Sequence, residues 1–212
     1  MIILIGGEKG GTGKSTLATN LAVWLASSEH DVCLVDTDIQ GTSTSWADRR
    51  TDAQLSPEIH VIQRTGKLVR PLQKLFDIHE FVIVDAGGRD SQELRSTLMV
   101  AHAAIIPIQA SIADLETVSS MSGILDGAKI LNEDLNAFFV ISRAPTNPKL
   151  KTDKGAREYI ADAAPDIPVI KASVCERQVY RDALIAGSSV IEERNKKAIA
   201  EINKVFKEMF HG

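Results

Sequence analysis

A glycine-rich segment near the start of the chain carries the residue types that hold a phosphate chain. Residues 8–16 are Glu-Lys-Gly-Gly-Thr-Gly-Lys-Ser-Thr, between an apolar run at 2–5 and a helix-forming stretch at 17–26. A turn between a strand and a helix directs backbone N–H groups and the positive end of the helix dipole at one point. In such a loop Lys14 is the point charge on the β- and γ-phosphates, and Ser15 supplies a hydroxyl ligand for Mg²⁺.

The segment departs from the strict pattern G-x-x-x-x-G-K-[ST], because Glu8 stands where the first glycine belongs. A second lysine, Lys9, follows it. Lys14 already lies inside a loop wrapped around phosphates, so a cation at the rim can point outward. Its most useful target would be a phosphate held by another copy of the chain. The alternative is a surface lysine beside a chance glycine cluster, but strand, loop, two lysines and helix occur in the order that the mechanism requires.

Two aspartates, Asp36 and Asp38, follow the apolar run at 32–35. Carboxylates at alternate positions just past a buried strand can serve a metal shell and a water molecule together. The alternative is a polar turn that caps the next helix through Asp38 or Thr42. Coupling to the phosphate loop favours the functional interpretation.

A third motif is Phe-Val-Ile-Val-Asp-Ala-Gly-Gly at 81–88. Its apolar residues predict a buried strand, and Asp85 at the tip can bind a metal-ligated water. Gly87 and Gly88 let the backbone approach a γ-phosphate where a side chain would obstruct it.

The three motifs resemble, in the same order, those of the ParA/MinD family of ATPases with a deviant Walker A box, K-G-G-x-G-K-[ST]. In that family the first lysine reaches across a nucleotide-sandwich dimer. The resemblance implies ATP and Mg²⁺ as cofactors, with Lys9, Lys14 and Asp38 as catalytic residues and Asp38 acting on the attacking water. Ser15, Asp36 and Asp85 are the implied metal residues. Ile39 replaces the proline of the family motif D-x-D-P-Q-G but removes no chemical group.

Adenine recognition in the family uses residues after the sixth strand. Here Arg143 could stack on a purine and Asn147 could bond its edge, or both could be ordinary loop residues. The residues expected to bind the nucleotide are Gly10, Gly11, Thr12, Gly13, Lys14, Ser15, Thr16, Gly87, Gly88, Arg143 and Asn147.

Residues 175–190 are similar to a segment of small plasmid partition ATPases of the ParF kind, R-x-x-Y-x-x-A-x-x-x-G-x-S-V. As in those proteins, the first strand is expected at the very start of the chain, without a preceding helix-turn-helix domain. The resemblance implies a cytoplasmic, nucleoid-associated homodimer in the ATP state. It also implies nonspecific DNA and a ParB-like adaptor protein as partners, a plasmid or similar cargo, and no membrane binding.

DNA contact is expected from basic residues of the last two helical segments. They are Arg177, Arg181, Lys196, Lys197, Lys204 and Lys207. Such a surface holds phosphates without selecting bases. Two alternatives remain open. One is a merely solvated face, since acidic residues interrupt it at positions 192, 193, 201 and 208. The other is a competing DNA surface formed by Lys67, Arg70 and Lys74, which are spaced for one helix face.

Other functions have weaker support. The apolar stripe of residues 199–210 resembles the amphipathic anchor of MinD, which would make the protein a membrane-associated positioning ATPase, but packing of a final helix on the sheet is the plainer interpretation. A ligase similar to dethiobiotin synthetase would not need an outward Lys9. An iron-sulfur reductase is disfavoured because Cys33 lies inside a predicted strand, which leaves only Cys175 as a ligand.

The elements that position these motifs alternate along the chain. Runs such as 32–36, 81–85 and 104–108 are apolar on both faces, which is typical of parallel strands covered by helices on each side. We therefore predict a doubly wound α/β domain over 1–212, with a mostly parallel sheet and a ligand site at the carboxyl ends of the strands. Strands are expected at 2–6, 32–36, 59–63, 81–85, 104–108, 137–142 and 169–172, and helices at 15–28, 44–50, 68–76, 91–101, 115–131, 154–163, 179–186 and 192–210.

Composition agrees with one compact domain. Of the 212 residues 44% are hydrophobic and 25% charged, which is typical of globular proteins. The formal net charge of −4 disfavours a strongly basic nucleic-acid binder, although it leaves room for a local basic patch. Two cysteines form no disulfide framework and no metal motif in the sequence, which indicates a reducing compartment.

Overall fold

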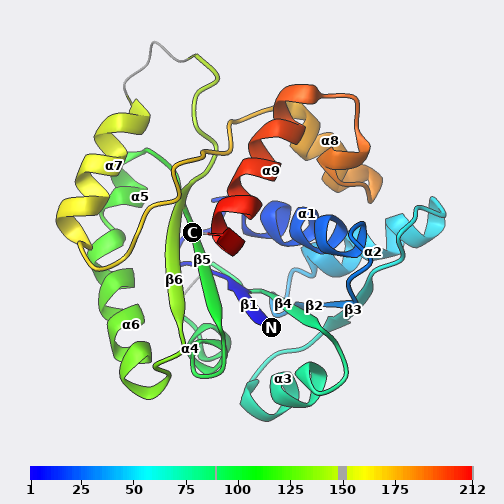
Figure 1. The fold of residues 1–212 in the computed structure, drawn as a ribbon, viewed down its shortest axis with the longest axis horizontal. Helices are drawn as coiled ribbons and strands as arrows, with labels where there is room; N and C mark the ends of the chain where they lie inside the picture. The colour runs from blue at the N-terminus through cyan, green and yellow to red at the C-terminus, as the bar shows by residue number, and fades with distance from the viewer. Residues whose placement is uncertain (89, 148–151, 212) are drawn as a thin grey trace.

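The computed structural model describes residues 1–88, 90–147 and 152–211, and these contain one parallel sheet of six strands (Figure 1). Its order is β3-β2-β4-β1-β5-β6. The strands are β1 (Ile2–Ile5), β2 (Val32–Asp36), β3 (His60–Gln63), β4 (Phe81–Asp85), β5 (Ala103–Ile108) and β6 (Asn136–Ile141). This confirms the predicted doubly wound α/β fold.

Helices cover both faces of the sheet (Figure 1). One hydrophobic cluster joins the sheet to α3, α4, α6 and α7, and the other joins it to α1, α2, α8 and α9. The aliphatic strands are buried on both sides because each face has its own helical layer. The helices are α1 (Lys14–Ala26), α2 (Thr42–Asp52), α3 (Val69–Phe76), α4 (Gln92–Leu98), α5 (Ile112–Leu115), α6 (Val118–Leu131), α7 (Thr152–Ala163), α8 (Gln178–Ala186) and α9 (Lys196–His211), with a 3-10 turn η1 (Val190–Glu192).

The strand expected at 169–172 is wrong. Val169 makes only an isolated bridge to Phe139, since Pro168 has no N–H to donate to a ladder. The Ile170 N–H still bonds the Phe139 carbonyl at 2.8 Å, but the next two N–H groups bond Glu208 of α9 instead. The segment therefore leaves β6 after one pair of hydrogen bonds.

Two predicted helices begin three or four residues later than expected. The helix expected over 115–131 is α6, which begins at Val118, and the short helix α5 before it was not expected. The tail helix begins at Lys196 rather than 192, because residues 190–192 form the turn η1 with a capping box between Ser189 and Glu192.

The apolar stripe of α9 packs into the core. Ile202, Val205 and Phe206 are fully buried, and the Phe210 ring stacks on Trp24 of α1 with centroids 5.7 Å apart. The plainer interpretation of this helix is confirmed, and its apolar face is covered by the protein itself.

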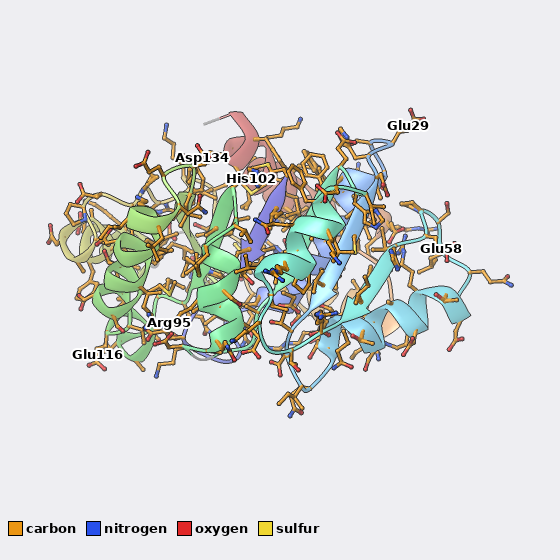
Figure 2. All side chains as sticks on the ribbon, turned by 90° about the horizontal axis from the view of Figure 1, so that it is seen from below. Glu29, Glu58, Arg95, His102, Glu116 and Asp134 are labelled. Atoms are coloured by element: carbon orange, nitrogen blue, oxygen red, sulfur yellow. The ribbon has the colours of Figure 1, made fainter. Side chains whose placement is uncertain are left out.

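The two ends of the sheet have different surroundings. Figure 2 shows Glu29, His102 and Asp134, which lie at or before the starts of β2, β5 and β6, along one edge of the view, and Glu116, which follows β5, at the opposite edge. The motif residues after β1, β2 and β4 belong to the carboxyl end. Within the described parts of the chain, no helix is both long enough and apolar enough to cross a bilayer.

Candidate nucleotide site

The glycine-rich loop connects β1 directly to α1. Gly11 and Gly13 have φ values of 77° and 93°, which side chains other than glycine rarely adopt. Gly13 is the N-cap of α1, and no side chain caps that end. The first N–H groups of α1 are thus available to an anion at the loop.

Neighbouring loops hold the glycine-rich loop in place. The Gly11 carbonyl accepts hydrogen bonds from Gln109 Nε2 at 3.0 Å and from Arg143 Nη1 at 2.8 Å. Gly88 packs against the loop from the β4 side, because a Cβ there would lie 2.6 Å from the Gly10 nitrogen. The ends of β4, β5 and β6 therefore all determine the position of this loop.

The two lysines of the loop have different surroundings. Lys14 is buried, and its Nζ donates to the Lys9 carbonyl at 2.6 Å. Burial lowers the pKa of Lys14, while the carboxylates of Asp85 and Asp38 act in the opposite direction. The Lys9 side chain is exposed. The loop thus directs one ammonium inward and leaves the other at the surface.

Asp36 and Asp85 are partners in register at the ends of β2 and β4. Asp85 is fully buried and accepts a hydrogen bond from Ser43 Oγ at 2.7 Å. Burial raises the pKa of Asp85 to about 7, and the neighbouring Asp36 adds to the rise, whereas Ser43, Ser15 and Lys14 oppose it. A nearby cation would stabilise the ionised form of this buried carboxyl group.

Asp36 organises the loop that follows it. Its Oδ1 accepts from the Asp38 N–H at 3.0 Å, and its Oδ2 accepts from the N–H and hydroxyl of Thr44 at 2.9 and 3.2 Å. Asp38 remains half-buried beside Gly87, where a Cβ would lie 3.4 Å from its Oδ2. In this geometry Asp36 positions Asp38, and Asp85 with Ser15 is the better oxygen pair for a metal ion.

Lys14, Ser15 and Asp38 line a cavity of about 350 Å³ between the glycine-rich loop, the loop after β2, the loop after β6 and α8. Three observations fit a phosphate chain with Mg²⁺. The Thr12 hydroxyl is buried without a hydrogen-bond partner among the described residues. The close approach of Gly88 leaves no room for a side chain against the loop. Ser15 and Asp85 offer the hard oxygen ligands that Mg²⁺ prefers.

The residues predicted to contact the base are divided. Arg143 lines the cavity and also pairs with Glu176 through Nη2 at 2.8 Å. Asn147 is exposed and is not part of the described cavity lining. Arg143 therefore lies at the cavity and contacts the glycine-rich loop, whereas Asn147 is outside the cavity lining that the described residues form.

The predicted DNA-binding residues also fall into two groups. Arg177 and Arg181 line the same cavity, where Arg177 pairs with Glu201 and Arg181 pairs with Glu176. The four lysines of α9, by contrast, are exposed. They are Lys196, Lys197, Lys204 and Lys207.

Sequence reasoning missed Ser43 and Gln109. Gln109 directly follows β5, so its place at the carboxyl edge of the sheet was a usable signal. Ser43 follows the second aspartate motif by five residues, but only the turn into α2 brings its hydroxyl to Asp85.

Comparison with known proteins agrees with this geometry. The family description "CobQ/CobB/MinD/ParA nucleotide binding domain" matches residues 3–190. The Halothiobacillus neapolitanus protein named maintenance of carboxysome distribution protein A is 30% identical over 211 residues, covering 95% of this chain and 92% of its own length. Apo McdA from Cyanothece has a similar structure, with a TM-score of 0.81, 18% identity and 98% coverage of both chains. A putative plasmid partition protein from Borrelia burgdorferi bound to AMPPNP has a TM-score of 0.74, 20% identity and coverage of 99% of this chain and 98% of its own.

Proposed function

The chain belongs to the CobQ/CobB/MinD/ParA nucleotide-binding family, and we propose from this premise that it is a Mg²⁺-dependent ATPase of the ParA type. ATP binding would join two copies, and the dimer would position or segregate a cargo such as a plasmid. The observation that carries the proposal is the different placement of two lysines of one loop, Lys14 buried and Lys9 exposed.

The proposed reaction is in-line attack of water on the γ-phosphate. Lys14 stabilises the developing charge from within the same subunit, and Lys9 does so in the site of the partner copy. Asp38 orients the water and is itself held by the bond from its N–H to Asp36. Ser15 and Asp85 would hold Mg²⁺, which when bound neutralises charge on the phosphate oxygens.

Turnover as a function of protein concentration tests this proposal. We expect ATP hydrolysis per molecule to rise with concentration in the wild type, because each site is completed by a second copy. Lys9→Ala should lower turnover by about 10²–10³-fold, as for removal of one group that stabilises the transition state. Lys67→Ala, another exposed lysine, is the matched control. Concentration-independent turnover that Lys9→Ala leaves intact would contradict the proposal.

The proposed DNA surface is the outer face of α9. Its four exposed lysines lie within an arc of about 100° on an ideal helix, opposite the buried apolar stripe. Acidic residues near them are engaged elsewhere: Glu201 with Arg177, and Glu208 with the N–H groups of 171 and 172. Arg177 and Arg181 should contribute less to DNA binding than the sequence suggested, because each already has a carboxylate partner.

The competing surface on α3 has a different character. Lys67, Arg70 and Lys74 border a depression with apolar walls that include Val69 and Leu75. Arg64 and Arg95 line the same depression, so this surface is basic as well. We favour α9 because its four lysines share one exposed helix face without apolar walls between them.

Salt dependence of DNA binding distinguishes the two surfaces. With a nonhydrolysable ATP analogue, replacing two lysines of α9, Lys196 and Lys204, by Ala should weaken binding to all sequences alike. It should also reduce the slope of log K against log salt by about 2 for each subunit. A matched double replacement of Lys67 and Lys74 should leave the slope unchanged. The reverse result would move the DNA surface to α3.

The proposal also includes a cargo that the protein positions and an adaptor protein that links it to that cargo. The Halothiobacillus relative is named for carboxysome distribution and the Borrelia relative for plasmid partition, which supports a positioning role. We infer a ParB-like adaptor that accelerates hydrolysis and a nucleoid-associated, cytoplasmic dimer. Purified protein with DNA should hydrolyse ATP faster when the adaptor encoded beside it is added, and the Lys9→Ala variant should not respond.

A further inference from the structure

A thiol and two imidazoles meet at the amino-terminal end of the sheet, away from the nucleotide cavity. Cys33 Sγ and one ring nitrogen each of His60 and His79 lie within 4.8 Å of one another. The three residues come from β2, β3 and the turn before β4. They are far apart in the sequence, so no local motif announces them.

The backbone places each of these side chains. Cys33 and His60 are register partners on adjacent strands, so their side chains point to the same face. The His79 N–H bonds the Leu75 carbonyl at 2.8 Å, which fixes the residue at the carboxyl end of α3. A cation is favoured near that end of a helix. The arrangement is therefore built into the sheet and not into a free loop.

A carboxylate orients one of the imidazoles. His79 Nδ1 lies 3.0 Å from both oxygens of Asp31. With Nδ1 donating to this carboxylate, the lone pair is on Nε2, which is the tautomer required of a metal ligand. A carboxylate behind a histidine is the usual outer shell of a zinc site.

We propose that Cys33, His60 and His79 bind a borderline-soft divalent cation of the Zn²⁺ class, with Asp31 orienting His79. Thiolate and imidazole are the ligands that Zn²⁺ prefers, and three protein ligands leave a fourth position for water. Binding converts the Cys33 thiol to a thiolate and releases its proton to solvent. Ligand atoms around Zn²⁺ lie roughly 3.3–3.8 Å apart, given bonds of about 2.0–2.3 Å, so the three groups must close by about 1 Å.

Because Cys33 is buried in the core, this closure falls to the exposed side chain of His60. Its ring centroid now lies 5.4 Å from that of His79. His60 is also the ligand that an ion from solvent meets first, since Cys33 is fully buried. The consequence of binding is mechanical. β3 is an edge strand whose one strand partner among the described residues is β2, and the ion would tie it to β2 and to the turn after α3.

Cobalt titration of the nucleotide-free protein tests this site. After removal of metals with a chelator, Co²⁺ should produce a thiolate-to-cobalt charge-transfer band and the visible bands of a tetrahedral complex, and Zn²⁺ should displace it. Oxygen ligands at the nucleotide cavity give no thiolate band, and the Cys175→Ser control accounts for the one thiol that lines it. The outcome is therefore independent of the proposed ATPase function. Zn²⁺ should also raise the Tm of the wild type.

The variants separate a metal site from simple packing. Cys33→Ser should abolish the charge-transfer band, and Cys175→Ser, which changes the other thiol, should keep it. His60→Ala alters an exposed side chain, so it should fold normally yet lose both the tetrahedral spectrum and the Tm shift. Asp31→Asn should weaken Co²⁺ binding by about 10–100-fold. Absence of the charge-transfer band in the wild type would overturn the proposal. Survival of the tetrahedral spectrum in folded His60→Ala would overturn it as well.

Discussion

Lys14 and Asp85 are oppositely charged groups that share one buried place at the edge of the sheet. Each is disfavoured there by loss of water, and each partly stabilises the other. Burial is the larger effect on both, since it lowers the pKa of Lys14 and raises that of Asp85 to about 7. The nucleotide-free site is thus under electrostatic strain that a phosphate chain and a divalent cation would relieve.

This strain makes Asp85→Asn a test of pH-dependent stability. The raised pKa of Asp85 means that the folded chain holds this proton more tightly than the unfolded chain, whose value is near 3.8. The stability from this group is complete below pH 3.8 and is lost as the pH rises through about 7. At pH 8 and without nucleotide, the free energy of unfolding of the variant should therefore be higher than that of the wild type by on the order of 2 kcal/mol. This corresponds to a Tm higher by about 4–8 °C.

Thermal melts at pH 5 and pH 8 measure this difference, which should be smaller at pH 5. Because Asn also removes a carboxylate ligand, Mg²⁺ should no longer raise the affinity of the variant for ATP. A variant that is less stable than the wild type at pH 8, without nucleotide, would show that the ionised Asp85 side chain does not destabilise the folded protein.

Gly88→Ala tests the packing of the β4 turn on the glycine-rich loop. The new Cβ would lie 2.6 Å from the Gly10 nitrogen, so the loop must shift. We expect ATP affinity to fall by at least about tenfold, since a displacement near 1 Å disturbs several phosphate contacts at once.

Gly127→Ala is the matched control, because a Cβ there meets nothing within 4 Å in the middle of α6. It should bind ATP normally and gain about 0.5–1 kcal/mol of stability. Equal affinities of both variants in a fluorescent-nucleotide assay would mean that Gly88 does not fix the loop.

For single residues, the sequence predicted which side chains gather at the site better than it predicted which partners each of them binds. The spacing of Asp36 and Asp38 indicated two carboxylates at one strand end, and the structure has them there. Only the backbone path into α2 reveals that both carboxylate oxygens of Asp36 accept hydrogen bonds from N–H and hydroxyl groups of the residues that follow it. The partners of Asp85 and of the Gly11 carbonyl come from distant segments, so local patterns do not identify them.

Among the elements, α1 links the glycine-rich loop to the C-terminal part of the chain. Asn20 Oδ1 accepts hydrogen bonds from Ser189 Oγ at 2.7 Å and from the Val190 N–H at 2.9 Å. Its Nδ2 donates to the Thr16 carbonyl at 2.7 Å in the first turn of α1. The Ser-Val pair noted in the sequence therefore has a structural task, which is to anchor the turn before α9 to the nucleotide helix.

Asn20→Ala should break this link. It leaves the Ser189 hydroxyl and the Val190 N–H buried without their acceptor, which costs about 2–3 kcal/mol of unfolding free energy. Asn136→Ala is the control, since that amide is exposed and bonds only the nearby Asp134 carbonyl. Urea unfolding of the two variants measures the difference. A loss below about 0.5 kcal/mol for Asn20→Ala would show that the anchor is dispensable.

Periodicity located the sheet well because its strands are aliphatic on both faces. It failed at 169–172, a short run that includes Lys171, where Pro168 and the competing acceptor Glu208 prevent a ladder. It also missed the short helix α5 and began α6 three residues early, since the turn at 116–117 carries neither glycine nor proline.

For the whole molecule, the arrangement separates two tasks. The carboxyl end of the sheet gathers the loops of the nucleotide cavity, with the exposed Lys9 at its rim. The outer face of α9 presents lysines while its inner face belongs to the core. A dimer formed through the rim would bring two such lysine faces into one particle, which is how a weak basic patch gains affinity for DNA.

Molar mass by light scattering is the most direct test of this account. Wild-type protein should be a monomer without nucleotide and with ADP, and should double its mass with a nonhydrolysable ATP analogue. Lys9→Ala should remain a monomer in all three states, while Lys67→Ala should behave like the wild type. A wild type that stays monomeric with the analogue, or a Lys9→Ala variant that dimerises as readily, would contradict the claim that Lys9 completes the site of a second copy.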